Sequence, residues 1–484
     1  MSARGALHRD PDRASGTRYD AVIIGGGIYG CMVALEAAGQ GLRTVLLERD
    51  DFGGATSWNS LRIVHGGLRY LQTADLARFY ESVVERRWFL RQFPELVHPL
   101  PCLMPLYREN RRSAGVLRAG ILINDLLSVR RNAGVGAAGV LPAGRWLGPS
   151  ETRSRIPGAS LPELRGAALW YDARMALSQR IIIETLRWAA GLGGIALNYV
   201  EAGELEVASG GQLEGVIGTD RCNGARLEFR APVVVNCAGP WTRRVAARFD
   251  REVEGLFRPS LAFNLVLDRA PLSDAAVAVP AGNGTYFLHE TGGRMFVGTH
   301  HEPLAGDSTR AEPSREEITR VLERINRAIP ELGFQLKDVL EVRAGLMPVR
   351  SSGSIDLSTR PVIVDHGSGG GPAGLLSVSG VKFTTARRVA EQVCRIILKR
   401  LHRRYQPDVL ARSGGTVPAS AAEIRSTIDR DPGAFRSEVA RIVAEEAVVY
   451  PEDLLLRRTA WGADPSIGPA LAAVLAGFPD VRAR

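Results

Sequence analysis

The chain has 484 residues, of which 23% are charged and 45% are apolar. This is the composition of a globular protein, and it excludes a disordered or a fibrous protein. This length exceeds the size at which one hydrophobic core stops growing, so two or three sub-domains are expected. The net charge of +9 favours anionic partners, but the basic residues are scattered, which argues against a nucleic-acid-binding face.

The N-terminal residues 1–18 carry charges and no apolar core, so we expect a mobile tail rather than a signal peptide. No apolar run approaches the roughly 20 residues needed to cross a bilayer. The five cysteines are far apart and form no CxxC pair, which excludes a disulfide framework and a zinc site. We expect a cytoplasmic protein, and a peripheral contact with the inner face of the membrane stays open.

Residues 19–50 predict a strand, a glycine-rich turn, a helix and a second strand. Gly25, Gly27 and Gly30 have the spacing GxGxxG. In that order, the glycines would make the turn, admit a pyrophosphate and let the helix press on the strand. Glu48 ends the second strand, where it would bind the ribose hydroxyls of adenosine. The stretch predicts a dinucleotide site, with a purely structural βαβ unit as the alternative.

A second stretch, GSGGGPAG at 367–374, contains the same glycine spacing and serves as an internal control. Pro372 interrupts it, and the strand-like LLSVSG follows instead of a helix, so we expect a loop. Only one such unit has the full context, which argues against a reductase that binds two nucleotides.

Two later segments favour FAD over NAD as the dinucleotide. APVVVNCAGPWT (231–242) predicts a strand ending in the small residues Ala238 and Gly239. Residues 374–401 predict a strand, then Gly380, then a helix that Thr384 and Thr385 can cap. The positive end of that helix would suit a reduced, anionic flavin ring.

The stretch GATSWNSLRIVHGGLRYL (54–71) resembles the FAD-dependent glycerol-3-phosphate dehydrogenase family of the D-amino-acid-oxidase superfamily. The resemblance covers most of residues 19–400, and more loosely the chain to about 470. It includes motifs in several parts of the sequence: GGGIYG, WYDARMAL (170–177), VVNCAGPW, MFVGT (295–299) and SGVKFTTARRVAE (379–391).

This resemblance implies an α/β fold: a Rossmann-like FAD domain with a parallel sheet, an interleaved substrate domain with an antiparallel sheet, and a C-terminal helical cap. It implies non-covalent FAD that takes a hydride from C2 of glycerol 3-phosphate, gives dihydroxyacetone phosphate and passes electrons to a quinone at a membrane surface. On this pattern Thr56, Ser57 and Ser60 would lie on the FAD phosphates and ribityl oxygens.

The stretch IVHGGLRYL (63–71) and Lys382 carry the residue types that alcohol oxidation needs: a base and cations for an anionic substrate. His65 is the candidate base, Arg69 could grip a phosphate or carboxylate, and Tyr70 could position the hydroxyl. Lys382 would stabilise negative charge near the flavin. The alternative for His65 is an ordinary hydrogen-bonded turn residue.

Two positions depart from the family pattern. Met347 stands where the family usually has a substrate-binding arginine, and methionine carries no charge or donor. Arg350, at an odd offset from Met347, is expected on the other face of the strand, while Arg343, at an even offset, is expected to lie beyond the pocket. GTHH (298–301) replaces GTTD; no acid or cysteine completes a metal site there, so surface imidazoles and no metal are expected.

The alternation of strand and helix signals gives approximate segment boundaries. Residues 115–131 predict a helix with one apolar face, more typical of core packing than of membrane contact. The expected segments are a tail (1–18), FAD-binding parts (19–90, 165–240 and 355–400), substrate-domain parts (91–164 and 241–354) and a helical cap (401–484).

Three functions remain open from the sequence. The first is oxidation of glycerol 3-phosphate or a related small phosphorylated alcohol, with a quinone or another acceptor. The second is oxidation of a small amine, amino acid or hydroxy acid, which Met347 makes more plausible. The third is flavin binding without turnover, against which His65, Arg69 and Lys382 argue.

Overall fold

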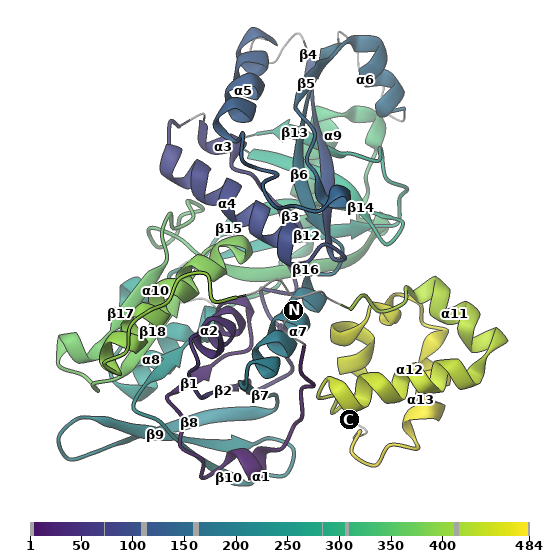
Figure 1. The fold of residues 1–484 in the computed structure, drawn as a ribbon. Helices are drawn as coiled ribbons and strands as arrows, with labels where there is room; N and C mark the ends of the chain where they lie inside the picture. The colour runs from purple at the N-terminus through teal and green to yellow at the C-terminus, as the bar shows by residue number, and fades with distance from the viewer. Residues whose placement is uncertain are drawn as a thin grey trace.

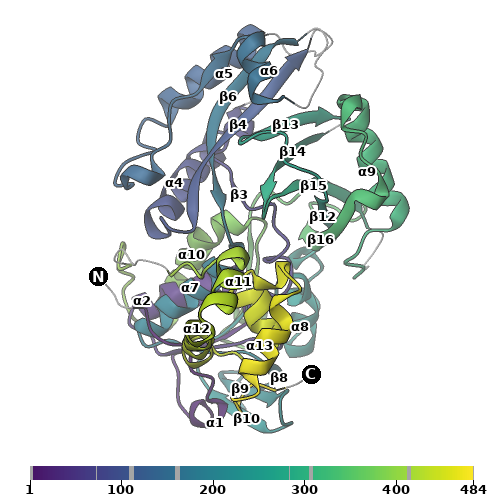
Figure 2. The same cartoon turned by 90° about the vertical axis from the view of Figure 1, so that its right-hand side faces the viewer.

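The computed structural model describes residues 4–71, 73–107, 114–157, 164–282, 284–304, 309–410 and 416–482. A parallel sheet with its helices forms one half of the molecule, and a larger, mostly antiparallel sheet forms the other (Figure 1). The C-terminal helices lie beside the parallel-sheet half in both views (Figure 2).

The parallel sheet is built from short, buried, apolar strands. Neighbours run parallel except at the β17 edge, where β17 and β18 are antiparallel. All residues of β1 and β2 are buried, as expected of strands that are covered on both faces. In spatial order the strands are β17 (Val362–Asp365), β18 (Leu375–Ser379), β11 (Val234–Asn236), β1 (Ala21–Ile24), β2 (Thr44–Leu47) and β7 (Ile195–Leu197).

The two faces of the parallel sheet have different covers. Ala21 and Ile23 of β1 pack toward the helices α2 (Ile28–Gly39), α7 (Ser178–Gly191) and α10 (Ala386–Arg400). Val22 and Ile24 point the opposite way, because successive side chains of a strand alternate between faces. That second face is covered by a small antiparallel sheet and a helix: β8 (Val200–Val207), β9 (Leu213–Asp220), β10 (Arg226–Arg230) and α8 (Thr242–Phe249).

The larger sheet joins strands from three distant parts of the chain. β6 begins the segment 165–240, which we expected in the FAD-binding part, but it pairs with β4 in the larger sheet. An apolar strand pattern does not indicate which sheet a strand joins. In spatial order the strands are β16 (Val339–Pro348), β12 (Pro259–Leu267), β15 (Arg294–Pro303), β14 (Gly284–Thr291), β13 (Ala276–Ala281), β4 (Val97–Tyr107), β6 (Leu164–Met175) and β3 (Ile63–Val64), with β5 (Arg145–Leu147) paired to β6.

The helices around this sheet are of two kinds. α9 begins at a capping box of Ser314 and Glu317, and packs Ile318, Val321 and Ile325 into the core of the sheet. α5, by contrast, buries little: Leu122 and Leu126 are 70% and 74% exposed, so the expectation of a packed helix is wrong. The remaining helices of this half are α3 (Leu68–Leu71), α4 (Leu76–Gln92) and α6 (Pro149–Arg155), while α5 spans Ala114–Leu127 and α9 spans Arg315–Ala328.

The C-terminal helices form a cluster with its own core. Phe435, Ile442, Leu454 and Trp461 are buried in it. Parts of the expected cap, 411–415 and 483–484, lie outside the described residues. None of the helices in the described ranges is long and apolar enough to cross a bilayer. The elements of the cluster are α11 (Ala421–Arg430), α12 (Pro432–Glu445), a π-helical turn η8 (Asp453–Arg458) and α13 (Ile467–Leu475).

The expected mobile tail is wrong for residues 4–18; residues 1–3 lie outside the described chain. Arg4 pairs with the buried Glu184, and Leu7 is buried with its N–H donated to the carbonyl of Glu445. A short helix, α1 (Pro11–Ala14), follows. The segment is polar in sequence, and its partners lie far along the chain, so composition alone could not place it.

Buried charges tie the C-terminal cluster to the parallel-sheet half. Glu446 is fully buried and accepts hydrogen bonds from Arg180 (2.5 Å) and Arg187 (2.6 Å). Arg458 donates to both carboxylate oxygens of Asp51, at 2.6 and 2.8 Å. Burial by itself raises the pKa of Glu446, but these arginines lower it below the ordinary value.

Replacing Glu446 by Gln should therefore destabilise the protein by about 3 kcal/mol at pH 7, since Arg180 and Arg187 each lose one of their two buried or half-buried carboxylate partners. The urea midpoint followed by tryptophan fluorescence measures it. Because the pKa of Glu446 is lower in the folded than in the unfolded protein, its carboxylate stabilises the fold above the unfolded pKa. The difference in stability between the variant and the wild type should therefore shrink below about pH 4.3. The neighbouring Glu445→Gln, at a half-exposed carboxylate, is the matched control. Equal effects of the two variants would contradict the assignment.

Candidate functional site

A cavity of about 3550 Å³ lies where the two halves meet. Ile24, Leu47 and Cys237 line it from the carboxyl ends of parallel strands, where ligands bind in open α/β sheets. Asn264 and Thr299 line it from the antiparallel sheet. The volume exceeds the roughly 300–1,000 Å³ of a pocket for one drug-sized ligand, so a dinucleotide and a small substrate fit together.

The glycine turn after β1 leaves no room for side chains. Gly25 has a φ of +105°, and a Cβ there would lie 2.6 Å from the carbonyl oxygen of Cys237. A Cβ on Gly30 would lie 1.9 Å from the carbonyl oxygen of Gly25. Gly27 is the N-cap of α2, so that the positive end of the helix opens on the cavity. The predicted strand, turn, helix and strand are confirmed, and GSGGGPAG is a loop as expected.

Glu48 lies at the end of β2 on the rim of this cavity. Its carboxylate accepts hydrogen bonds from the backbone N–H of Gly26 (2.6 Å) and of Asp50 (2.8 Å). Burial raises the pKa of Glu48, although these two donors oppose the shift. The side chain is thus held in a fixed orientation beside the glycine turn. Ala238 and Gly239, after β11, line the same end of the cavity.

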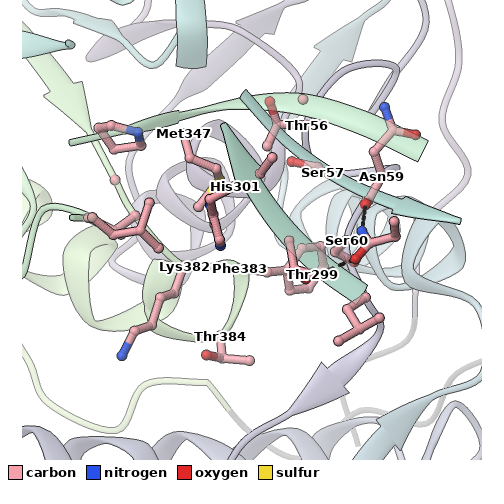
Figure 3. Close-up of a pocket in the computed structure, with 18 of the residues that line it drawn as sticks. Thr56, Ser57, Asn59, Ser60, Thr299, His301, Met347, Lys382, Phe383 and Thr384 are labelled. Carbon is pink, nitrogen blue, oxygen red and sulfur yellow. Dashed lines mark hydrogen bonds between the residues drawn. The ribbon is translucent and has the colours of Figure 1, made fainter. Parts of the chain in front are cut away.

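The loop 54–60 spans the cavity between the two halves (Figure 3). The hydroxyl of Ser57 accepts a hydrogen bond from the N–H of Ile28 at 3.0 Å, at the start of α2. Thr56 and Asn59 donate to backbone carbonyls of β16, at 3.2 and 2.6 Å. The buried hydroxyl of Ser60 has no partner among the described residues. Buried hydroxyls are normally hydrogen-bonded, so this one indicates a ligand. Asn59 is a site residue that the sequence reading missed.

Tyr29 fixes the loop between β18 and α10. Its hydroxyl donates to the carbonyl oxygen of Lys382 (2.7 Å) and accepts from the Lys382 N–H (3.0 Å). Burial raises the pKa of Tyr29 to about 12, so the ring stays neutral. A Cβ on Gly380 would lie 1.7 Å from that ring. The expected side-chain capping by Thr384 and Thr385 is wrong: Thr385 is the N-cap residue, but its hydroxyl donates to the Lys382 carbonyl.

The predicted catalytic residues share one wall of the cavity. The ammonium group of Lys382 contacts the hydroxyl of Tyr70 and lies 4.4 Å from its ring centroid. Arg69 is exposed to the cavity. The ring of His65 is about half exposed, and its Nδ1 lies 3.1 Å from a carboxylate oxygen of Asp172. Asp172 belongs to the WYDARMAL motif, but its residue type alone did not single it out.

Two uncharged side chains from the antiparallel sheet also line the cavity. Met347 and His301 line it from β16 and β15, with only Ser260 and Ala262 of β12 at the intervening positions (Figure 3). Burial lowers the pKa of His301 to about 4, so the imidazole is neutral. Its Nδ1 is buried and has no hydrogen-bond partner among the described residues.

The expectation of surface imidazoles is wrong for both histidines. His300 points to the other face of β15, where it lies 2.7 Å from the hydroxyl of Tyr286 and 2.9 Å from Glu302. Strand alternation places one histidine on each covered face, so both are mostly buried. In the described part of the chain no group of three potential ligands could hold a metal ion.

The two arginines beside Met347 occupy different places. Arg343 is not part of the cavity lining; it pairs with both oxygens of Glu341 at 2.9 Å and lies 5.5 Å from the ring of Trp58. Its position beyond the pocket is as the strand pattern predicts. Arg350 is exposed on the rim, so neither of these two arginines takes the place of the family arginine.

Comparison with known proteins agrees with this site. Residues 20–395 match the family described as FAD dependent oxidoreductase. The chain belongs to this FAD-dependent oxidoreductase family. It is 32% identical to glycerol-3-phosphate dehydrogenase 1 of Mycobacterium tuberculosis, over 99% of this chain and 98% of that protein. It is 29% identical to the glycerol-3-phosphate dehydrogenase of Synechocystis, over 81% of this chain and 72% of that one.

Solved structures show the same fold. The glycerol-3-phosphate dehydrogenase of Bacillus halodurans, solved with FAD, superimposes with a TM-score of 0.71 at 20% identity, over 98% of this oxidoreductase and 93% of that chain. Glycine oxidase of Geobacillus kaustophilus gives a TM-score of 0.55 at 18% identity, over 83% of this chain and all of that one. The glycine turn and the unpartnered Ser60 hydroxyl fit FAD, the cofactor of the family.

Replacing Gly30 by Ala should remove most of the bound FAD, because the new methyl group overlaps the carbonyl of Gly25 and the turn must open. The ratio of flavin to protein absorbance after purification measures the effect. Gly210→Ala, where a Cβ meets nothing within 4 Å, is the control and should keep the wild-type ratio. Full FAD content in Gly30→Ala would show that this turn does not hold the cofactor.

Proposed function

We propose that this oxidoreductase oxidises glycerol 3-phosphate, or a closely related small phosphorylated alcohol, to the ketone with non-covalent FAD as hydride acceptor. The observation that carries the proposal is the cavity wall on which His65, Arg69 and the contacting pair Tyr70 and Lys382 lie together. The relatives named glycerol-3-phosphate dehydrogenase support the same substrate.

The proposed roles follow from charge and position. When bound, FAD supplies an acceptor for the hydride from C2 of the substrate. His65 takes the hydroxyl proton, and Arg69 pairs with the phosphate. Tyr70, oriented by its contact with the Lys382 ammonium, donates a hydrogen bond to the substrate oxygen. Lys382 stabilises negative charge at the hydride acceptor.

The proposed cofactor contacts are spread over the cavity rim and come from the ends of the parallel strands and from loop 54–60. Backbone and small side chains predominate, which lets the diphosphate approach the start of α2 closely. The proposed FAD-binding residues are Gly25, Gly27, Gly30, Glu48, Thr56, Ser57, Ser60, Ala238, Gly239, Gly380 and Thr384.

A second candidate function is favoured by Met347. Met347 and the neutral His301 offer no positive charge to a second anionic group, so Arg69 would hold the one anionic group of the substrate. Such a site also suits a small amine, amino acid or hydroxy acid with one anionic group. The substrate test therefore includes these compounds.

Anaerobic mixing of the FAD-loaded protein with candidate substrates tests the function. We expect glycerol 3-phosphate to bleach the flavin absorbance faster than glycerol, amino acids or hydroxy acids. His65→Asn should slow bleaching by about 100-fold or more while FAD stays bound, because a general base is lost. His402→Asn, at a residue outside the cavity, is the control. Bleaching only by amino or hydroxy acids would assign the protein to the second candidate function. No bleaching by any compound would contradict the proposal that the protein is an active enzyme.

We also propose a peripheral contact with the membrane and a quinone-type acceptor. Leu122 and Leu126 expose an apolar face of α5 to solvent, while Leu117 and Ile121 of the same helix line the cavity. Exposed apolar groups of this kind insert into the headgroup region of a bilayer.

The surroundings of α5 fit this proposal. Arg118 and Arg130, both exposed, flank the apolar face with positive charge, as at surfaces that bind anionic lipids. The free thiols of all five cysteines fit the cytoplasmic side.

Replacing Leu122 and Leu126 together by Gln should weaken binding to vesicles containing anionic lipid and slow reduction of a lipophilic quinone. Flavin bleaching by substrate should be unchanged, because the two side chains are not part of the cavity lining. Co-sedimentation with vesicles and quinone-dependent turnover measure the two effects. Val207→Gln, at a 43% exposed position on the far small sheet, is the control. Unchanged vesicle binding in the double variant would refute the contact.

A further inference from the structure

The carboxylate of Asp172 on β6 is buried beneath the catalytic wall. One oxygen, Oδ1, accepts from the N–H of Gly66 (2.7 Å) and from Nη1 of Arg86 (2.8 Å). The other, Oδ2, lies 3.1 Å from Nδ1 of His65 and accepts a longer bond from Nε1 of Trp170 (3.4 Å). Every partner of Asp172 is therefore a donor or, at His65, a ring nitrogen that is able to donate.

The charge state of Asp172 is fixed by these partners. Burial alone raises the pKa of this carboxyl, but the hydrogen bond and charge of His65, the charge of Arg86 and the Gly66 N–H lower it to about 2. Asp172 is thus a carboxylate at neutral pH and can only accept hydrogen bonds. A neutral His65 must then carry its proton on Nδ1, which leaves the lone pair on Nε2.

The position of the ring completes the geometry. His65 lines the cavity, and its ring lies 5.2 Å from that of Phe287. Among the described residues Nδ1 has Asp172 as its partner, whereas Nε2 has none. The basic nitrogen is therefore the one left open to a ligand in the cavity.

Arg86 holds the carboxylate from behind. It is buried on α4, and its Nη1 also donates to the carbonyl of Tyr171 at 2.7 Å. A Cβ on Gly66 would lie 1.9 Å from this Nη1, so the first glycine of the HGG motif is what gives Arg86 its place. The chain from Arg86 through Asp172 to His65 is continuous.

We propose that Asp172, held by Arg86, is the positioning residue that fixes His65 in the tautomer able to take a proton at Nε2. The inference rests on the proposed alcohol oxidation. As the C2–H electron pair leaves as hydride to the flavin, the O–H bond breaks, its electron pair forms the C=O bond, and the proton passes to Nε2. Asp172 keeps its negative charge and stabilises the imidazolium so formed.

The variant Asp172→Asn tests this directly. The carbonyl oxygen of the new amide is the only acceptor for Gly66 and Arg86, so its NH₂ group must face Nδ1 of His65. The imidazole then accepts at Nδ1 and carries its proton on Nε2, which is the wrong tautomer for a base. We expect flavin reduction by substrate to fall by about 100-fold or more, with FAD content unchanged.

The tautomer itself can be measured without any substrate. In protein labelled with ¹⁵N-histidine, the His65 signals are identified by their loss in His65→Asn. In the wild-type holoenzyme with a neutral imidazole, the ¹⁵N shifts should show protonation at Nδ1, and in Asp172→Asn at Nε2. Protonation at Nε2 in the wild-type protein would overturn the proposal. The proposed substrate plays no part in this result.

A double variant separates positioning from plain structural support. If Asp172 acts through His65, adding Asp172→Asn to His65→Asn should cause no further loss in flavin reduction. If the rate losses of the two single variants multiply in the double variant, Asp172 has a structural role that does not act through His65. Asp220→Asn is the matched control, because Asp220 is equally buried and binds Arg9 outside the cavity. If no compound reduces the flavin, the substrate proposal fails, whereas the tautomer measurement still decides the role of Asp172.

Discussion

The bridge that residues 54–71 make between the two halves is the constraint on which the site depends. Ser57 binds the first turn of α2, and Asn59 binds β16 across the cavity. A few residues later β3 pairs with β6, so His65 leaves the loop from a fixed strand end. The distance between the cofactor turn and the candidate base is therefore set by one short, hydrogen-bonded segment. Any movement of one half against the other must distort it.

Local signals in the sequence were enough for the cofactor half. The buried strands, the glycine turn and the motif HGGLRYL each have a short-range physical cause, and the structure forms them where the pattern predicts. Long-range partners were not accessible in this way. The N-terminal residues 4–18 carry no apolar pattern, and they are held by contacts with Glu184 and Glu445, which lie far away in the sequence. The apolar pattern of β6 fits a strand of either sheet, so its pairing with β4 could not be predicted.

Polar residues within the site show the same division. His300 and His301 read as solvent-exposed, yet their strand is covered on both faces, which only tertiary structure reveals. Asp172 became a candidate only when β6 placed it beneath His65. Met347, in contrast, was recognised from sequence because a missing charge is a property of the residue itself. The cavity consequently has the uncharged Met347 and His301 in its lining as well as the cations of Arg69 and Lys382.

The pairing of Asp51 with Arg458 has a consequence for how the protein is made. The two residues are separated by 407 positions, so the loop after β2 leaves the ribosome long before its counter-ion. β18, which completes the parallel sheet next to β11, is also synthesised late. The nascent chain therefore carries an unfinished nucleotide cleft through most of translation. The cleft is therefore completed, and able to hold its cofactor, only after β18 and the C-terminal cluster have been synthesised.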